Sequence, residues 1–253
     1  MANPDSATHA VAPRIVASGH GAMVYDAALP DVPDHDWFEP AWWVARGGMQ
    51  SRAGGRGGVA FVQAPFGTCV LRHYRRGGLV APLLDDRYLW TGRGRCRGFA
   101  EFVLLAELLA RSLPVPAPVA ARCERHGLFY TADLITRAIG NARTLAQAAA
   151  AGGLDSALCE RVGALVARFH AEGVDHADLN AHNILVADDN LWLIDFDRGE
   201  IRTSGTAWKL ANLARLKRSL LKVGACHHDD TALDREVWRP LMRGYQSVGG
   251  QAR

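Results

Sequence analysis

The sequence predicts an α+β protein of two lobes, with a β-rich N-terminal lobe and an α-rich C-terminal lobe. Short apolar runs bounded by glycine and proline dominate the first half, and segments with apolar residues at helical spacing dominate the second. With 253 residues, 49% hydrophobic and 22% charged, the chain can bury a sizeable core. We place the N-terminal lobe at 14–138 and the C-terminal lobe at 139–246, after a small, polar segment 1–13 expected to be disordered.

The strands of the N-terminal lobe are indicated by the turns between them. Residues 14–26 predict a strand or hairpin, and the apolar runs 59–63 and 68–74 flank a short turn that predicts a second hairpin. Residues 118–123 and 127–135 predict two further strands. An aromatic segment, 36–46, and a run rich in glycine and arginine, 47–58, lie before the second hairpin.

The expected helices follow from apolar periodicity and capping residues. Residues 98–111 form the one helix of the N-terminal lobe, and prolines in 113–118 end it and give an extended connector. In the C-terminal lobe the predicted helices are 144–151, 155–171 with an Asp155 cap, 206–223 and 230–246.

Composition excludes several classes of protein. The five cysteines are odd in number and form no CxxC pair, so we expect free thiols and no disulfide or thiolate zinc site. No apolar run is long enough to cross a membrane and the N-terminus lacks a secretory pattern, which predicts a cytoplasmic location. The net charge of +3 favours an anionic partner, although the excess of arginine over lysine is equally well explained by coding bias.

The most informative segment combines two motifs. His176, Asp178, Leu179 and Asn183 fit the protein-kinase catalytic loop, H-R-D-L-x-x-x-N, in register. Twelve residues after Asn183, the pair Asp-Phe at 195–196 matches the first two positions of D-F-G, and a predicted hairpin joins the two motifs. The two motifs in this order predict a protein-kinase-like fold that uses ATP and Mg²⁺.

The residue types suit phosphoryl transfer, which depends on positioning and on neutralising phosphate charge. Asp178 is the expected catalytic base, because a carboxylate there can orient the acceptor hydroxyl and accept its proton. Asn183 and Asp195 offer oxygen ligands for Mg²⁺ from two chain segments. We expect His176 to brace the loop.

The N-terminal lobe must then supply a cation for the nucleotide phosphates and a glutamate that holds it. No lysine precedes Lys209, so Arg72 is the best candidate, with Arg75 and Arg76 as alternatives. Glu101, in the predicted helix, is the best partner, with Glu107 as the alternative.

Two backbone segments complete the expected nucleotide site. Gly55, Gly57 and Gly58 lie where a glycine loop could cover the phosphates. The hinge whose backbone contacts adenine is expected just after a strand. We place it at Thr136 to Ala138.

The chain resembles the lipopolysaccharide kinase family over roughly residues 14–245. The resemblance is carried by the stretches 71–78, 176–185 and 193–202 and by the predicted helix 208–220. The resemblance implies ATP-dependent phosphorylation of 3-deoxy-D-manno-octulosonic acid (Kdo) on a lipid A precursor, at the hydroxyl on carbon 4. It also implies peripheral attachment to the cytoplasmic face of the bacterial inner membrane.

Departures from the protein-kinase pattern favour a small or lipid-linked acceptor. Asn180 stands where protein kinases usually have a lysine, so another cation must assist, with Arg72, Arg198 or a second metal ion as candidates. Asp197 replaces the glycine of D-F-G, which makes a regulatory flip unfavourable. No A-P-E triplet follows, and Ile201 leads quickly into a helix, which leaves little room for a peptide-docking segment.

Membrane contact and two other functions remain open at this point. The helix 206–223 has leucines on one side and Arg215, Arg218 and Lys222 on the other, which fits either a membrane surface or a packed helix with a solvated basic face. The aromatic segment 36–46 has the same ambiguity, and we favour a role in the core.

The alternative functions are a small-molecule kinase of the aminoglycoside or choline type and a pseudokinase scaffold. A nucleic-acid binder ranks last, since the arginines are dispersed. The oligomeric state is not predicted.

Overall fold

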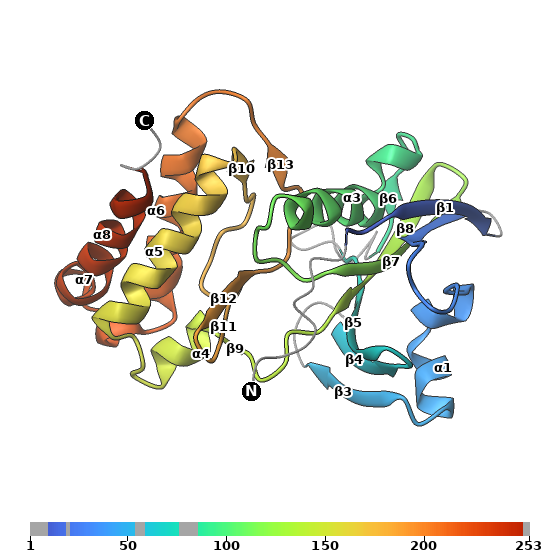
Figure 1. Cartoon of the computed structure of the whole chain (residues 1–253), viewed down its shortest axis with the longest axis horizontal. Coiled ribbons are helices and arrows are strands. Elements are labelled where there is room, and N and C mark those ends of the chain that lie inside the picture. The colour runs from blue at the N-terminus through green and yellow to red at the C-terminus, as the bar shows by residue number, and fades with distance from the viewer. Residues whose placement is uncertain (1–9, 19–20, 54–58, 76–85, 250–253) are drawn as a thin grey trace. The chain divides into compact units, whose positions relative to one another are not determined.

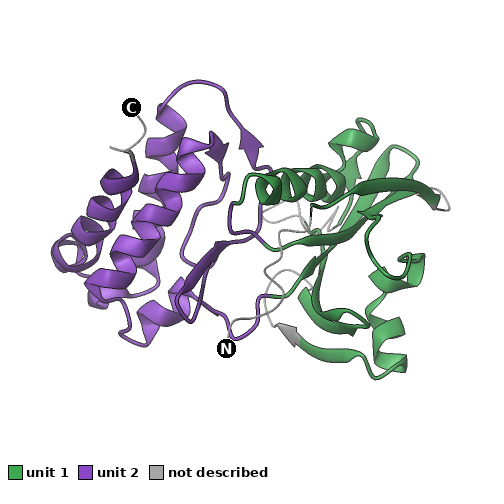
Figure 2. Ribbon diagram, in the orientation of Figure 1, with its two compact units in different colours: residues 1–112, 116–138 green, residues 113–115, 139–253 purple. Residues whose placement is uncertain are grey.

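The computed structural model describes residues 10–18, 21–53, 59–75 and 86–249. The chain forms two compact units, which Figure 2 shows in different colours. Unit 1 comprises residues 1–112 and 116–138, and unit 2 comprises 113–115 and 139–253. Unit 1 is built on an antiparallel sheet and unit 2 is mainly helical, so the prediction of an α+β fold is confirmed.

The sheet of unit 1 runs in the order β1-β2-β7-β8-β5-β4-β3, and β6 pairs with the start of β8 (Figure 1). Every neighbouring pair is antiparallel. The strands are β1 (Pro13–Ser18), β2 (Gly21–Asp26), β3 (Met49–Ala53), β4 (Val59–Ala64), β5 (Gly67–His73), β6 (Tyr88–Leu89), β7 (Pro118–His126) and β8 (Phe129–Arg137). The predicted hairpins are confirmed. Strand β3 was not expected, because its backbone hydrogen bonds come from pairing with β4 and its sequence carries little strand propensity.

The two faces of this sheet are sorted by the period of two along each strand. On β5, Cys69 and Leu71 belong to the aromatic core on one face. Arg72 and Tyr74 reach Glu101 of α3 (Arg97–Ala110), so they lie on the opposite face. Helix α3 confirms the predicted helix and buries Phe102, Leu105 and Leu108, among other residues.

The aromatic segment forms the core on the first face. It folds into η1 (His35–Phe38) and α1 (Pro40–Ala45), which bury Trp37, Phe38 and Trp43 against β2, β4, β5 and β8. The Trp43 indole donates a hydrogen bond to the Trp37 carbonyl at 2.7 Å, which satisfies the buried N–H. Trp42 is partly buried against the same cluster. The aromatic segment is therefore core, as the sequence analysis favoured.

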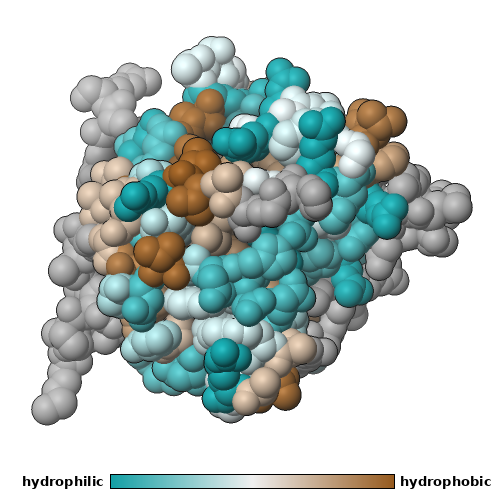
Figure 3. Space-filling view, turned by 90° about the vertical axis from the view of Figure 1, so that its right-hand side faces the viewer, coloured by the Kyte–Doolittle hydropathy of each residue, from teal (hydrophilic) through white to brown (hydrophobic). Residues whose placement is uncertain are grey.

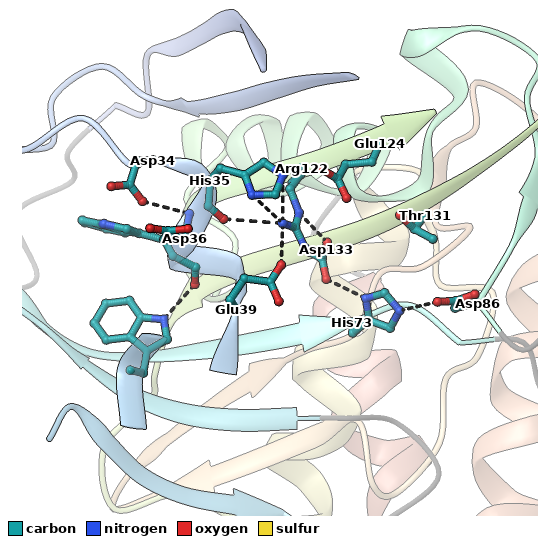
Figure 4. Close-up of polar contacts among 12 residues, drawn as sticks. Asp34, His35, Asp36, Glu39, His73, Asp86, Arg122, Glu124, Thr131 and Asp133 are labelled. Carbon is teal, nitrogen blue, oxygen red and sulfur yellow. Dashed lines mark hydrogen bonds and ion pairs between the residues drawn. The ribbon is translucent and has the colours of Figure 1, made fainter. Parts of the chain in front are cut away.

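A polar cluster fixes η1 to the sheet (Figure 4). Buried Arg122 donates to Asp133 at 2.9 Å and to Glu39 at 2.8 Å, and it also contacts His35. His73 faces the Asp133 carboxylate at 2.6 Å, and this hydrogen bond raises the pKa of His73. Because each buried charge has an opposite partner, the cluster stabilises the attachment of η1 without leaving an unpaired ion.

Unit 2 contains small strands and six helical segments within the described residues. The strands are β9 (Arg143–Thr144), β10 (Val174–Asp175), β11 (Ile184–Ala187), β12 (Asn190–Leu193) and β13 (Glu200–Ile201). The helices are α4 (Leu145–Ala150), α5 (Ser156–Ala171), α6 (Ala207–Lys222), the short η3 (Ala225–His228), α7 (Asp230–Leu233) and α8 (Arg239–Gly249); a π-helical turn, Asp234–Trp238, joins the last two. The predicted helix 230–246 is thus interrupted.

Capping and packing account for the unit 2 helices that the sequence predicts. Asp155 accepts a hydrogen bond from the Leu158 N–H at 2.7 Å and caps α5, and Thr144 with Gln147 forms a capping box on α4. The leucines of α6 at 213, 216 and 220 are buried, so its apolar face packs within the protein. No helix in the described part of the chain is long and apolar enough to span a membrane.

The cysteines are free thiols, as predicted. Four are buried and Cys226 is partly exposed. Burial raises the pKa of Cys69 to about 11 and that of Cys159 to about 12, so both stay protonated and unreactive near neutral pH.

A buried histidine is expected to make unit 2 acid-sensitive. His170 is buried, its Nδ1 lies 2.8 Å from the Tyr245 hydroxyl, and burial lowers its pKa to about 4. The unfolded chain binds a proton at this residue below about pH 6.5 and the folded chain does not, so stability falls as the pH drops from 6.5 towards 4. His170 should account for a loss of about 2 kcal/mol between pH 7.5 and pH 5.

Denaturant unfolding at these two pH values measures the effect. The difference should disappear largely in His170→Gln and persist in His182→Gln, which replaces an exposed histidine of the same unit. An unchanged pH slope in His170→Gln would contradict the assignment.

Candidate active site

The segment 176–183 forms two consecutive turns in unit 2. The Leu179 N–H donates to the His176 carbonyl at 3.3 Å, and the Asn183 N–H donates to the Asn180 carbonyl at 3.1 Å. Leu179 is buried and anchors the loop, while Asp178 beside it is exposed. The loop therefore presents the Asp178 carboxylate to solvent from a fixed backbone.

His176 joins this loop to the strand that precedes Asp195. Its Nε2 lies 3.0 Å from the Ile194 carbonyl, and its Nδ1 lies 3.2 Å from the Asp178 N–H. A carbonyl can only accept and an N–H can only donate, so His176 is neutral with the proton on Nε2. Burial lowers the pKa of His176, which agrees with the neutral form. The side chain braces the loop, as expected, and makes no contact that implies proton transfer to a substrate.

Asn180 organises the loop in a way that the sequence analysis missed. Its amide nitrogen donates to the backbone carbonyl and to Oδ2 of Asp178, both at 3.0 Å, and its Oδ1 accepts from the His182 N–H at 2.8 Å. Asn180 thereby holds the Asp178 carboxylate in one orientation. An Asn two residues before a backbone N–H is typical of an Asx turn, which was the available signal.

The hairpin β11–β12 brings the two proposed metal ligands to the same end. Ile184 pairs with Leu193, and the next hydrogen bond joins the Ile194 N–H to the Asn183 carbonyl at 3.0 Å. Asn183 lies opposite Ile194 at this end of the hairpin, and Asp195 follows one residue later. The hairpin predicted from the sequence is confirmed.

The backbone and the following ring fix the direction of Asp195. Asp195 has φ 63°, a left-handed conformation that costs of order 1 kcal/mol for a residue with a Cβ. Buried Phe196 packs against the His176 ring at 4.8 Å and the Phe169 ring at 5.9 Å between centroids. The strain is held by this packing, and such strain concentrates at functional sites.

Helix α6 supports the loop at both ends through polar side chains. The His176 N–H donates to Asn212 Oδ1 at 3.2 Å, and the Ala181 N–H donates to Ser219 Oγ at 3.0 Å. The Asn212 amide also donates to Asp175 at 2.9 Å, and Arg202 donates to the same carboxylate at 2.7 Å. No sequence signal marked these residues, because they meet the loop only through the fold.

In unit 1 the structure brings Arg72 and Glu101 together in an ion pair. Glu101 is buried and Arg72 is mostly buried. Tyr74 joins them, since its hydroxyl donates to Glu101 at 2.6 Å and accepts from Arg72 at 2.9 Å. The Arg72 guanidinium also lies over the Tyr74 ring, 4.6 Å from the centroid. The sequence analysis did not single out Tyr74.

The alternatives to this pair are placed elsewhere. Glu107 forms a surface ion pair with Arg111, four residues later in the chain. Arg75 is exposed. Arg76 lies outside the described residues. The position of Glu101 depends on Gly98, because a Cβ there would stand 2.7 Å from the Asp133 carbonyl. Only glycine lets α3 approach the sheet this closely.

Two predicted backbone segments have different outcomes. Gly55, Gly57 and Gly58 lie outside the described residues. In the predicted hinge, Thr136 lies inside β8, paired with Val70, rather than after the strand, and Ala138 donates its N–H to the Thr68 carbonyl at 3.0 Å. Pairing with β5 extends β8 beyond its apolar run, so the Ala138 N–H is hydrogen-bonded to β5.

The donor set in unit 2 suits a hard cation. Within the described residues no group of three or more His, Cys, Asp or Glu side chains is placed to hold a metal ion. The Asn183 amide nitrogen donates to the Asp178 carbonyl at 3.0 Å, which leaves its Oδ1 as the atom for a cation. An amide oxygen and a carboxylate are ligands that Mg²⁺ accepts when water and phosphate oxygens complete its shell.

A family model described as the lipopolysaccharide kinase (Kdo/WaaP) family matches residues 40–245. The chain belongs to this family. The prediction of a kinase, an enzyme that transfers phosphate from ATP, is therefore confirmed. The matched range includes every candidate site residue named above.

Relatives with a stated activity cover nearly the whole chain. The 3-deoxy-D-manno-octulosonic acid kinase of Xanthomonas axonopodis pv. citri (strain 306) is 48% identical over 247 residues, 97% of each chain. The kinase of the same name from Xylella fastidiosa (strain M23) is 45% identical over 236 residues, 92% of this chain and 93% of the relative.

A solved structure of WaaP in complex with acyl carrier protein has a TM-score of 0.47 and 16% identity. The match covers 83% of this chain and 92% of that one.

Proposed function

We propose that this kinase transfers the γ-phosphate of ATP to the hydroxyl on carbon 4 of Kdo, carried on a lipid A precursor. The observation that carries the proposal is the catalytic loop, in which Asn180 holds the exposed Asp178 carboxylate and His176 holds the Asp178 backbone N–H. A fixed carboxylate suits the deprotonation of a sugar hydroxyl. The names of relatives at 45–48% identity support Kdo as the acceptor.

We assign the roles in the two units as follows. Asp178 orients the acceptor hydroxyl and accepts its proton, and His176 and Asn180 position it. Asn183 and Asp195 hold Mg²⁺, which neutralises phosphate charge when bound. In unit 1, Arg72 contacts the nucleotide phosphates, with Glu101 fixing its guanidinium. A guanidinium offers two parallel donors to phosphate, so it can replace the usual lysine.

The acceptor places the reaction at a membrane. A Kdo-bearing lipid A precursor is held in a bilayer by its acyl chains, so we propose that the chain works as a peripheral protein on the cytoplasmic side of the inner membrane. The structure offers no spanning helix in its described part. Recognition of the acceptor is then a matter of surface contact with lipid and sugar.

The position of the new phosphate tests the regiochemistry. The product of the reaction with ATP, Mg²⁺ and a Kdo-bearing precursor should show phosphorus coupling to the proton on carbon 4 of Kdo by nuclear magnetic resonance. Coupling to a proton on another carbon would refute the assignment of the hydroxyl while leaving a kinase.

Removal of one hydroxyl tests the phosphate-binding pair. Tyr74→Phe keeps the ring beneath Arg72 and the direct Arg72–Glu101 ion pair, and it removes the hydroxyl that contacts both partners. We expect the KM for ATP to rise about fivefold, corresponding to about 1 kcal/mol for one hydrogen bond, with a smaller change in kcat.

The matched control is Tyr88→Phe, which removes the hydroxyl of another buried tyrosine in unit 1. Its KM for ATP should stay unchanged. Equal effects of the two substitutions on KM would indicate a general loss of stability in unit 1 and contradict a positioning role for Tyr74.

A further inference from the structure

A basic and apolar surface forms at one end of the unit 1 sheet, where two segments distant in sequence meet. Strand β6 pairs with β8 through Tyr88 with Tyr130 and Leu89 with Phe129. The Trp90 N–H then donates to the Leu128 carbonyl at 2.9 Å. We call the surface made by residues 87–95 and 125–131 the sheet-end surface.

Large apolar side chains are exposed on the sheet-end surface. Leu128, in the β7–β8 turn, is 71% exposed, and Leu89 is 58% exposed. Trp90 and Phe129 are partly buried beside them. Figure 3 shows hydrophobic patches standing apart in a largely hydrophilic surface, on the side of the molecule at the right of Figure 1. Strand alternation puts Leu89 on the face opposite Tyr88 and Trp90, whose rings contact Tyr130, so the exposed apolar component consists of Leu128 at the turn and Leu89 on one face.

Within its two segments the charged side chains have one sign, and the bordering carboxylates Asp86 and Glu124 pair with His73 and His35. The two segments contain four arginines and no aspartate or glutamate: Arg87, Arg93, Arg95 and Arg125. All four are exposed, and in the described part of the chain none forms an ion pair with a carboxylate. Arg125 lies over the Trp90 ring at 5.4 Å and donates to the Gly127 carbonyl at 2.9 Å, which fixes the turn.

The combination matches the interface of an anionic bilayer. Leucine and tryptophan enter the boundary between headgroups and acyl chains, and arginines bind the lipid phosphates around them. Unpaired arginines also make the surface unsuitable for burial against a second copy of itself, because like charges would face each other. A phospholipid surface therefore fits both the apolar and the charged component.

The sheet-end surface lies at the end of β8 that is farther from Arg72. Arg72 pairs with Leu134 on β8, and Leu89 pairs with Phe129 five residues nearer the turn. At about 3.3 Å per residue, the sheet-end surface lies roughly 17 Å beyond Arg72 along the strand. The opposite end of β8, at Arg137, leads into unit 2. Arg72 therefore lies nearer the unit 2 end of β8, three residues from Arg137, than the end that carries this surface, five residues away at Phe129.

We propose that the sheet-end surface docks unit 1 on anionic phospholipid. The proposal rests on the proposed function in one respect: a lipid-linked acceptor gives the protein a reason to contact a membrane. Helix α6 is the competing basic element. Its leucines at 213, 216 and 220 are buried, its Lys217 is paired with Asp234 at 3.2 Å, and Leu210 is its one exposed large apolar residue among those described. The apolar component that inserts into a bilayer is therefore stronger at the sheet end.

Vesicle flotation of the full chain, without ATP or acceptor, tests the proposal. The protein should float with vesicles of phosphatidylethanolamine and 30% phosphatidylglycerol, be released by salt, and not float with pure phosphatidylcholine. Arg93→Gln with Arg95→Gln should weaken binding at least about tenfold, since each arginine near an anionic surface contributes about 1 kcal/mol. Leu128→Asp, in an exposed turn, should weaken it similarly.

The matched controls are Leu210→Asp and Arg218→Gln on α6, which should bind as the wild type does. The proposal would be overturned if the α6 variants lost vesicle binding while the sheet-end variants kept it. It would also be overturned if the wild type floated only with vesicles that contain the Kdo-bearing acceptor. Failure of the wild type to float with either phospholipid mixture would also overturn it. Because no nucleotide is present, these outcomes are independent of the proposed kinase reaction. The sheet-end variants should also phosphorylate acceptor in detergent micelles at the wild-type rate.

Discussion

Asp178→Asn is expected to lower the rate of phosphoryl transfer by at least about a hundredfold, the lower range for loss of a general base. The substitution keeps the size of the side chain and an oxygen that can accept the hydrogen bond from Asn180. It removes the carboxylate that we propose takes the proton from the acceptor hydroxyl. Affinity for the magnesium nucleotide should stay close to that of the wild type, because Asp178 is not among the proposed metal ligands.

Steady-state kinetics and nucleotide titration together measure these two effects. Asp189→Asn is the matched control, because it neutralises an exposed aspartate in the β11–β12 turn of the same unit. Its rate should be that of the wild type. An Asp178→Asn protein that turns over within fivefold of the wild type would contradict the role of Asp178 as base.

Gly163→Ala is expected to destabilise the chain by about 3 kcal/mol, the range for overpacking at a close contact. Helices α5 and α8 touch backbone to backbone at this point: a Cβ on Gly163 would stand 1.8 Å from the Leu241 carbonyl oxygen. The contact is reciprocal, because a Cβ on Gly244 would stand 1.9 Å from the Glu160 carbonyl oxygen. Backbone cannot move aside as a flexible side chain can, so the helices must separate.

The sign of the effect distinguishes this account from helix propensity. Alanine inside a helix is normally favoured over glycine by about 1 kcal/mol, so propensity alone predicts stabilisation. Gly140→Ala, where a Cβ meets nothing within 4 Å, is the control and should change the free energy of unfolding by less than about 0.5 kcal/mol. Denaturant unfolding of the two variants measures both. A stabilised Gly163→Ala protein would contradict the close crossing.

The sequence was sufficient wherever local signals mark an element. The hairpin at residues 184–193 was predicted because its apolar runs flank Asp188 and Asp189, and α5 because Asp155 precedes a helical apolar pattern. Strands β10 and β13 were missed, since two residues each carry no pattern and their pairing is set by tertiary contact. Strand β8 ends two residues later than predicted for a related reason, because pairing with β5 extends it past its apolar residues.

The candidate site shows the same division. The motifs give the order of Asp178, Asn183 and Asp195, and the hairpin register places Asn183 opposite Ile194, the residue before Asp195. The supports of the loop are Asn212 and Ser219, more than 30 residues along the chain, and only the packing of α6 brings them there. Tyr74 escaped notice since a tyrosine near a strand end is usually part of a core. Its hydroxyl contacts with Arg72 and Glu101 distinguish it.

The most direct test of the account is transfer of radiolabelled γ-phosphate, with Mg²⁺, to a lipid A precursor with Kdo and to the same precursor without it. The account predicts label on the Kdo-bearing lipid alone, and loss of that label in Asp178→Asn. Equal labelling of both lipids, or labelling of neither by a protein that still binds ATP, would contradict the assignment of Kdo as the acceptor.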